Sequence, residues 1–169
     1  TVTLDNVTTD VAVISYMTTT LIGSTYGEFT FPKKSKVNLQ APAMAFTSIA
    51  NGYLYDAQDT SLTVGVMKDC TFSNRKTTTL NATTCTNLKV SAYYRLTLDI
   101  GCAAPVEMNN GALLNVLRGT VTVTTPSIEL STLSASGNAL VRFSTLRIRL
   151  SDFHAVLQCT GEGTLTLAS

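Results

Sequence analysis

Apolar and polar side chains alternate with a period of two along much of this chain. The longest such stretch is residues 88–102, LKVSAYYRLTLDIGC, whose apolar side chains fall on even positions, with Tyr93 the one aromatic residue at an odd position. These side chains are Leu88, Val90, Ala92, Tyr94, Leu96, Leu98, Ile100 and Cys102. Because successive side chains of a β-strand point to opposite faces, the alternation predicts a strand with one buried and one solvated face. The stretch is far longer than an ordinary strand, so we expect it to bend across two sheets.

Shorter runs of the same kind, such as residues 10–17, 27–32 and 36–42, end at proline or at polar residues. The dipeptide Asn51–Gly52 lies between two such runs and is typical of a two-residue hairpin turn. The length of 169 residues fits one domain covering residues 1–169. The sequence therefore predicts a single all-β domain, folded as an antiparallel β-sandwich or a partly closed β-barrel or roll.

The composition strengthens the expectation of strands. Charged residues make up 14% of the chain, against about 25% in typical soluble domains. Threonine supplies about one residue in six and takes the place of the missing charges. Because threonine is β-branched, it favours a strand surface over a helical one.

Four cysteines accompany a single histidine, and no C-x-x-C motif occurs. This is poor material for a zinc site, so we expect disulfides and neither a metal nor a cofactor. Cys70 and Cys85 bracket a polar stretch and are expected to pair, which leaves Cys102 to pair with Cys159, although four cysteines allow three connectivities. Two intrachain disulfides would place the protein in an oxidising setting that is extracellular, at the cell surface or periplasmic.

Asn6 in NVT and Asn81 in NAT match the acceptor pattern for N-linked glycosylation. A chain this rich in threonine also produces such matches by chance. No run approaches 18 apolar residues, so any membrane association would come through a segment that is not in this sequence. The start at Thr1 without methionine suggests a mature or trimmed form.

The net charge of +1 and the pI of about 7.6 argue against nucleic acid as a partner, because nucleic-acid binders concentrate basic residues on one face. The densest basic spot holds Lys33, Lys34 and Lys36. We interpret it as a solvated turn beside a strand edge and not as a binding patch.

Catalytic chemistry has little support in the sequence. His154 follows Ser151 and Asp152, but neighbours on a strand point in different directions, whereas a nucleophilic triad must converge in space. We therefore interpret His154 as a structural histidine and expect no enzyme. The chain has no tryptophan, and four of its tyrosines are expected to pack within sheets as cross-strand pairs. These tyrosines are Tyr53, Tyr55, Tyr93 and Tyr94.

The leading hypothesis is a secreted or cell-surface, non-enzymatic structural or interaction module, such as a filament, pilus, coat or adhesin subunit. Its partner would be another protein or a second copy of the chain, and the first residues could form an edge strand or an arm donated to a neighbour. The alternative is an extracellular binder of lipid or another apolar ligand in a β-barrel or β-groove, suggested by the dry face of residues 88–102. A hydrolytic enzyme would rest on His154 alone.

Overall fold

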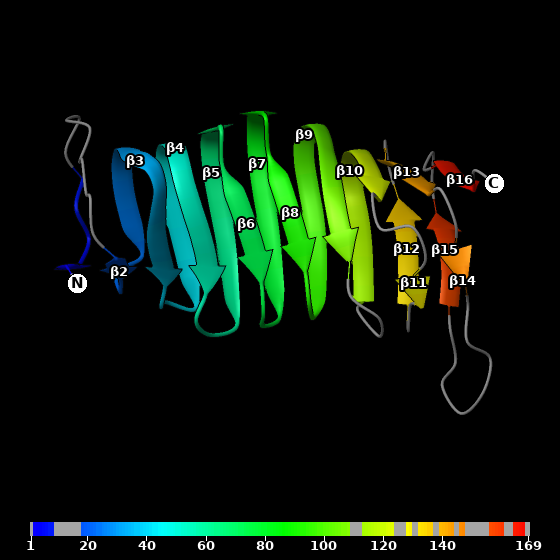
Figure 1. Cartoon of the computed structure of the whole chain (residues 1–169), viewed down its shortest axis with the longest axis horizontal. Helices are drawn as coiled ribbons and strands as arrows, with labels where there is room; N and C mark the ends of the chain where they lie inside the picture. The colour runs from blue at the N-terminus through cyan, green and yellow to red at the C-terminus, as the bar shows by residue number, and fades with distance from the viewer. Residues whose placement is uncertain are drawn as a thin grey trace.

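The computed structural model describes residues 2–8, 18–108, 113–123, 128–129, 132–136, 139–143, 146–147, 156–160 and 164–167. Within these residues the chain winds into a β-solenoid of about six turns, whose strands stack side by side along one axis (Figure 1). The strand pairs are parallel, as between β4 (Ala43–Asp56) and β5 (Thr60–Lys68). The all-β class is confirmed, and the predicted antiparallel sandwich or barrel is wrong.

Each central turn has two sides, which we call the long side and the short side. The long side contains β5, β7 (Thr78–Thr86) and the first halves of β4 and of β9 (Arg95–Met108). The short side contains β6 (Thr71–Asn74), β8 (Lys89–Ala92) and the last residues of β4 and β9. The other strands are β1 (Val2–Leu4), β2 (Thr19–Leu21), β3 (Thr25–Leu39), β10 (Leu113–Val123), β11 (Ile128–Glu129), β12 (Thr132–Ser136), β13 (Ala139–Phe143), β14 (Leu146–Arg147), β15 (Val156–Thr160) and β16 (Thr164–Leu167).

The solenoid is built on a register of 18 residues per central turn. Asp69 and Asn87, which occupy the same place in two neighbouring turns, are 18 residues apart. With this register Leu62, Leu80 and Leu98 lie beside one another in consecutive strands, and all three are fully buried. Each inward position thus becomes a column of stacked apolar side chains, and these columns together form one continuous core.

The buried face predicted for residues 88–102 is confirmed except at Tyr94 and Cys102. The buried side chains of this stretch are Leu88, Val90, Ala92, Leu96, Leu98 and Ile100. The stretch is not one bent strand across two sheets, as predicted: it forms β8 on the short side and the first half of β9 on the long side, and both strands belong to the same sheet. The turn between them contains Tyr94, which is therefore exposed although it obeys the even-number rhythm.

The predicted hairpin at Asn51–Gly52 does not form. Asn51 has a φ of 61°, but the chain continues within β4 from the long side to the short side. Asp69 and Asn87 hold the same corner in the next two turns, with φ values of 52° and 53°, and Asn87 Nδ2 donates to Asp69 Oδ1 at 2.7 Å. Asn and Asp tolerate the left-handed conformation better than most residues do. The dipeptide therefore indicates a corner with left-handed backbone conformation. The corner leads the chain from the long side to the short side and does not form an antiparallel hairpin.

Two glycines on the long side allow neighbouring turns to approach closely. A Cβ on Gly65 would come within 2.6 Å of the Thr47 carbonyl oxygen, and a Cβ on Gly101 would overlap the Thr83 carbonyl oxygen. Threonine and glycine thus alternate from turn to turn at this level of the stack. The glycines are required here by the space between turns.

One disulfide lies in the part of the chain whose side chains the structure describes. It joins Cys85 of β7 to Cys102 of β9, with 5.5 Å between their Cα atoms and 17 residues between their positions. Both predicted pairs, Cys70–Cys85 and Cys102–Cys159, are therefore wrong. Cysteines that are about one turn apart in sequence lie on neighbouring strands of the solenoid. The polar stretch between Cys70 and Cys85 forms strands of the solenoid and needs no disulfide to close it.

The other two cysteines have different positions. Cys70 is a buried free thiol at a corner, with its Sγ 3.2 Å from the Lys68 carbonyl oxygen and 3.6 Å from that of Ile49. Burial raises the pKa of this thiol, which disfavours the reactive thiolate. Cys159 lies in β15, and its side chain is outside the described part of the structure.

At the N-terminal end, β1 pairs with β2 of the same chain as an edge strand. Among the described residues there is no helix with the length and hydropathy needed to cross a membrane.

Candidate functional site

The short side carries a groove whose shape follows from the sizes of the outward side chains. In one column across the turns, Tyr55 lies beside Ser73, Ser73 beside Ser91, and Ser91 beside Glu107. The neighbouring column places Tyr53 beside Thr71 and Thr71 beside Lys89. Tyr53 and Tyr55 on β4 and Glu107 on β9 therefore flank the smaller Thr71, Ser73 and Ser91. The hollow between them is also lined by Lys89 of β8.

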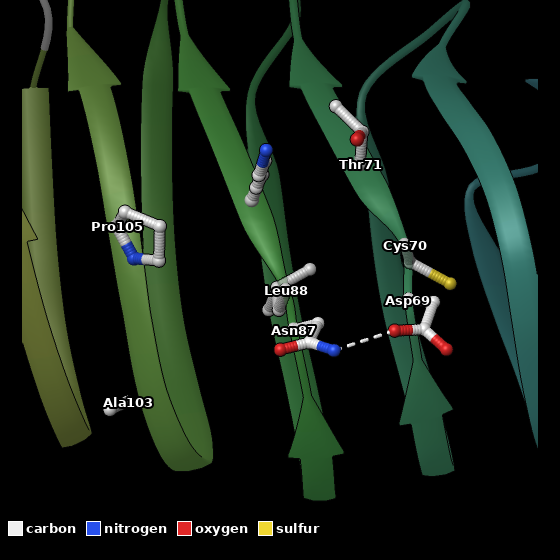
Figure 2. A pocket seen from close by; sticks show the side chains of 8 residues that line it. Asp69, Cys70, Thr71, Asn87, Leu88, Ala103 and Pro105 are labelled. Atoms are coloured by element: carbon white, nitrogen blue, oxygen red, sulfur yellow. Dashed lines mark hydrogen bonds between the residues drawn. The ribbon is translucent and has the colours of Figure 1, made fainter. Parts of the chain in front are cut away.

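The hollow has two connected parts that share Thr71, Lys89 and Pro105. The part next to β4 has a volume of about 330 Å³ and is lined by Tyr53, Thr71, Lys89, Val90, Ser91, Pro105 and Glu107. The part next to the corner has a volume of about 570 Å³ and is lined by Asp69, Cys70, Thr71, Asn87, Leu88, Lys89, Ala103 and Pro105. Figure 2 shows this second part, with the Asn87–Asp69 hydrogen bond at its end and the Cys70 sulfur pointing away from Pro105. We call the two parts together the short-side groove.

Tyr53 lines the groove, and two further tyrosine rings lie near it. Tyr53 and Tyr55 stack on each other, with ring centroids 6.1 Å apart and an interplanar angle of 26°. Tyr53 is 39% exposed, and Tyr93 in the turn between β8 and β9 is 48% exposed. The prediction that the tyrosines pack within the sheets is wrong for Tyr93, which lies in a turn, whereas Tyr53 and Tyr55 lie in β4 beside residues of β6.

Arg75 lies between two of these rings. Its guanidinium carbon is 5.5 Å from the centroid of Tyr55 and 5.8 Å from that of Tyr93, which is cation–π range. Within the described residues, the ion pair is between Arg118 and Asp99, and Arg75 has no carboxylate partner. Its charge is therefore positioned by aromatic faces and is not neutralised by an acid.

A buried polar cluster fixes the backbone that carries Arg75. The Asp56 carboxylate accepts hydrogen bonds from the backbone N–H groups of Arg75 at 2.5 Å and Lys76 at 3.1 Å. It also accepts from Thr78 Oγ1 at 2.6 Å and Asn74 Nδ2 at 3.0 Å. Burial raises the pKa of Asp56, and these hydrogen bonds oppose the shift. The Asp56 carboxylate thus fixes the backbone of the turn that carries Arg75.

Asn74 extends this cluster to the next turn of the solenoid. Its Nδ2 also donates to the carbonyl oxygens of Lys76 at 2.6 Å and Arg95 at 3.2 Å, and its Oδ1 accepts from the Tyr94 backbone N–H at 3.1 Å. The two turns that present Arg75 and Tyr93 are therefore linked through one buried amide.

Other residues singled out in the sequence lie elsewhere. Lys36 is an exposed residue within β3, beside Tyr53. It therefore lies in a strand and not in the predicted turn. The Asn6 side-chain oxygen accepts from the backbone N–H groups of Ser24 at 2.8 Å and Thr25 at 3.1 Å. Asn81 lies half-buried within β7 on the long side. Glycosylation of either asparagine stays a prediction, and His154 with its neighbours lies outside the described residues.

Sequence reasoning missed the short-side groove because it did not use the 18-residue register. The signal was available in the corner residues Asn51, Asp69 and Asn87, which recur at that interval. Once the turns are aligned on these corners, Tyr53, Thr71 and Lys89 fall in one column.

Comparisons with known proteins add no assignment to this geometry, since no family model, no curated protein and no solved structure matches the chain.

Proposed function

We propose that the chain is a non-enzymatic interaction module of an extracellular or cell-surface structure, such as a filament, coat or adhesin, and that it binds its partner through the short-side groove. The observation that carries this proposal is the Arg75 guanidinium, which lies between the rings of half-buried Tyr55 and exposed Tyr93 and has no ion-pair partner among the described residues. Arginine and tyrosine are the residues most enriched where protein surfaces make strong contacts. Their gathering on one face of the solenoid favours binding on that face.

The scaffold beneath the groove supports the same proposal. Parallel strands of successive turns are joined by a continuous backbone ladder, and the Cys85–Cys102 disulfide adds a covalent link between two turns. Such a scaffold holds the outward side chains at fixed spacings of about 4.8 Å from turn to turn. Little conformational entropy is then lost when a partner binds. The disulfide mildly favours an oxidising environment outside the cell.

The alternative of an apolar ligand gains no support from the residues that suggested it. The inward side chains of residues 88–100 pack against other turns of the core, and none of them lines an open apolar hollow apart from Leu88 and Val90 at the floor of the short-side groove.

The test measures retention of the purified protein on immobilised extracellular material from the producing organism. Wild-type protein should be retained, and the double variant Tyr53→Ala/Arg75→Ala should not. The control is the double variant Thr63→Ala/Thr79→Ala, which removes exposed hydroxyls from the long side and should behave as wild type. Equal retention of all three proteins, or retention of none, would overturn the proposal.

Cellular location requires a separate measurement. An antibody raised against the folded chain should label intact, unpermeabilised cells or detect the protein in the medium. Labelling that requires permeabilisation would contradict the extracellular part of the proposal.

A further inference from the structure

We propose that the short-side groove binds an acidic saccharide chain, with its sugar rings against the Tyr53–Tyr55 stack and its carboxylate or sulfate groups on Arg75 and Lys89. This inference rests on the proposed function and names the chemical class of its partner. Three properties support it: an aromatic wall formed by Tyr53 of the groove and its stacked neighbour Tyr55, the hydroxyl floor of the groove, and the cations Lys89 in the groove and Arg75 on Tyr55.

The aromatic wall matches the apolar face of a sugar ring. A pyranose presents several C–H groups on one face, and these carry small positive charge that is attracted to the negative face of an aromatic ring. Tyr53 and Tyr55 form a stacked pair along β4, and the 39% exposure of Tyr53 leaves part of its surface open to solvent. An extended saccharide can follow this wall without a change in the fold.

The floor offers hydrogen bonding of the kind that sugar hydroxyls need. Thr71 and Ser91 line the hollow, and each hydroxyl can donate one hydrogen bond and accept two. The Glu107 carboxylate on the opposite wall can accept from sugar hydroxyls, which are donors. Mixed donors and acceptors suit a polyhydroxylated ligand better than a purely apolar one.

The cations select for negative charge on the saccharide. The faces of Tyr55 and Tyr93 hold Arg75 while its planar N–H groups stay able to bind a carboxylate or sulfate by two hydrogen bonds. Lys89 lies within the groove, and Lys36 lies beside Tyr53. A neutral glycan would leave these charges without a counter-charge.

The same surface is poorly suited to the other polyanion with stackable rings, single-stranded nucleic acid. Such proteins combine stacking rings with a strongly positive track that follows every phosphate. Here Glu107 and Asp69 line the groove together with Lys89, and the chain carries a net charge of only +1. An anionic saccharide, whose charges are more widely spaced along a hydroxylated chain, fits this mixture better.

The test measures equilibrium binding of the folded protein to four polymers by biolayer interferometry. These are polygalacturonate for carboxylates, dextran sulfate for sulfates, dextran as the neutral saccharide, and polydeoxythymidine as single-stranded DNA. We expect binding to one or both acidic saccharides, at least tenfold weaker binding to dextran and DNA, and loss of affinity as salt rises from about 50 to about 500 mM. The stronger of the two acidic saccharides identifies the anionic group.

Matched variants locate the site. Arg75→Gln and Tyr53→Ala should each weaken binding by about tenfold, and Lys89→Gln by about threefold. Arg118→Gln makes the same chemical change on the long side and should leave binding unchanged. Circular dichroism and thermal unfolding of every variant establish that the protein compared is folded.

Three results would overturn the inference: absence of binding to both acidic saccharides, equal or tighter binding to dextran or DNA, and equal loss of affinity in Arg75→Gln and Arg118→Gln. If wild-type protein fails to bind these polymers but is still retained on extracellular material through Tyr53 and Arg75, the saccharide assignment is wrong and the interaction module stands. Failure of both assays removes both proposals.

Discussion

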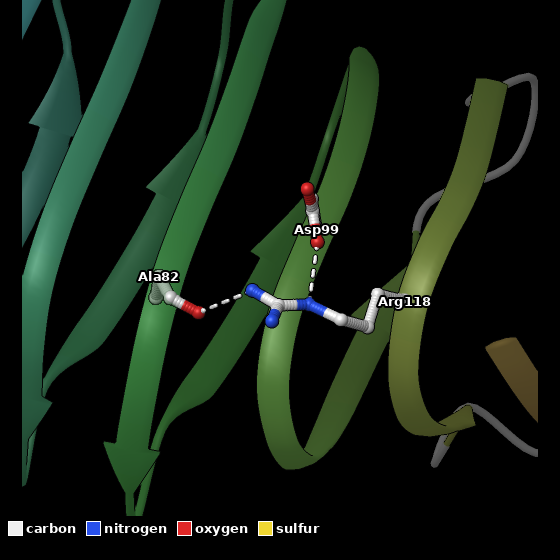
Figure 3. Close-up of polar contacts among 3 residues, drawn as sticks. All are labelled: Ala82, Asp99 and Arg118. Carbon is white, nitrogen blue, oxygen red and sulfur yellow. Dashed lines mark hydrogen bonds and ion pairs between the residues drawn. The ribbon is translucent and has the colours of Figure 1, made fainter. Parts of the chain in front are cut away.

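Arg118 is half-buried and Arg75 is exposed on the same solenoid, and their surroundings differ as well. On the long side, Arg118 Nε donates to Asp99 Oδ1 at 2.7 Å and its NH2 group to the Ala82 carbonyl oxygen at 3.2 Å, so that one side chain spans three consecutive turns (Figure 3). On the short side, Arg75 has only the rings of Tyr55 and Tyr93 around its guanidinium among the described residues.

Arg118 therefore links neighbouring turns of the solenoid, whereas Arg75 is available to a ligand. The hydrogen bonds of Arg118 end within the protein, whereas the Arg75 guanidinium has no ion pair with an acid among the described residues. The long side also has a column of small residues, which includes Ser61, Thr79 and Thr97. The comparison predicts that changes on the long side alter unfolding, and that changes at the groove alter binding.

The largest effect on unfolding is expected for the double variant Cys85→Ser/Cys102→Ser. Closing a loop of this length stabilises the folded state by about 3 kcal/mol in the chain-entropy model. The free energy of unfolding, measured by denaturant titration, should fall by about this amount while saccharide binding stays unchanged. A loss of binding in folded variant protein would show that the disulfide also shapes the groove.

Asp56→Asn should reduce the free energy of unfolding by about 2 kcal/mol, because an amide cannot accept all the hydrogen bonds that the carboxylate accepts. Asp56→Asn should affect both unfolding and binding, because Asp56 accepts a hydrogen bond from the backbone of Arg75. We expect weaker saccharide binding as well, in contrast to the cysteine variant. Unchanged binding would separate the cluster from the groove.

The same variant has a defined pH dependence. Burial raises the folded-state pKa of Asp56 above its ordinary value of 3.8, so the folded protein holds this proton more tightly than the unfolded chain does. The contribution of Asp56 to stability is then greatest below pH 3.8 and declines as the pH rises through the raised pKa. Unfolding titrations of wild type and Asp56→Asn across this window should show a difference that shrinks with rising pH. A difference that grows would mean that the hydrogen bonds outweigh burial.

Arg118→Gln should lower the free energy of unfolding by about 1 kcal/mol or less, because its ion pair with Asp99 is partly exposed, at 41% and 31%. The effect should diminish at high salt, since screening weakens the pair in the wild type. Thermal unfolding at two salt concentrations measures this. A salt-independent effect would assign the stabilisation to the Ala82 hydrogen bond instead of the ion pair.

Arg75→Gln is expected to have the smallest effect on unfolding, about 0.5 kcal/mol or less, because it removes only exposed cation–π contacts. The same variant should have one of the largest effects on binding. Thermal unfolding and saccharide titration of the same variant test whether its effect on stability is small while its effect on binding is large. A destabilisation similar to that of Arg118→Gln would assign Arg75 a structural role and end the contrast between the two sides.

The extent to which sequence predicted the candidate site is clear from the tyrosines. Tyr53 and Tyr55 lie two positions apart, so the period of two places them on one face of β4, where their rings stack. Phe46 and Leu54 are buried at even positions of the same strand, so these odd-numbered tyrosines lie on its outward face. The contact between Tyr55 and Arg75, which is 20 residues further along the chain, depended on the stacking of turns.

The sequence by itself determined the strands and the inward side chains, because the alternation of Leu96, Leu98 and Ile100 with polar residues is a local property that holds for any β-sheet. Only the tertiary structure decided the direction of pairing, the disulfide partners and the groove. Each of these depends on which residue lies one turn away, and alternation has the same period in parallel and antiparallel sheets. The left-handed corners at Asn51, Asp69 and Asn87 made that choice, since they turn the chain from the long to the short side without reversing it. With about one turn between them, Cys85 and Cys102 then became neighbours, and Tyr55, Arg75 and Tyr93 came together on one surface.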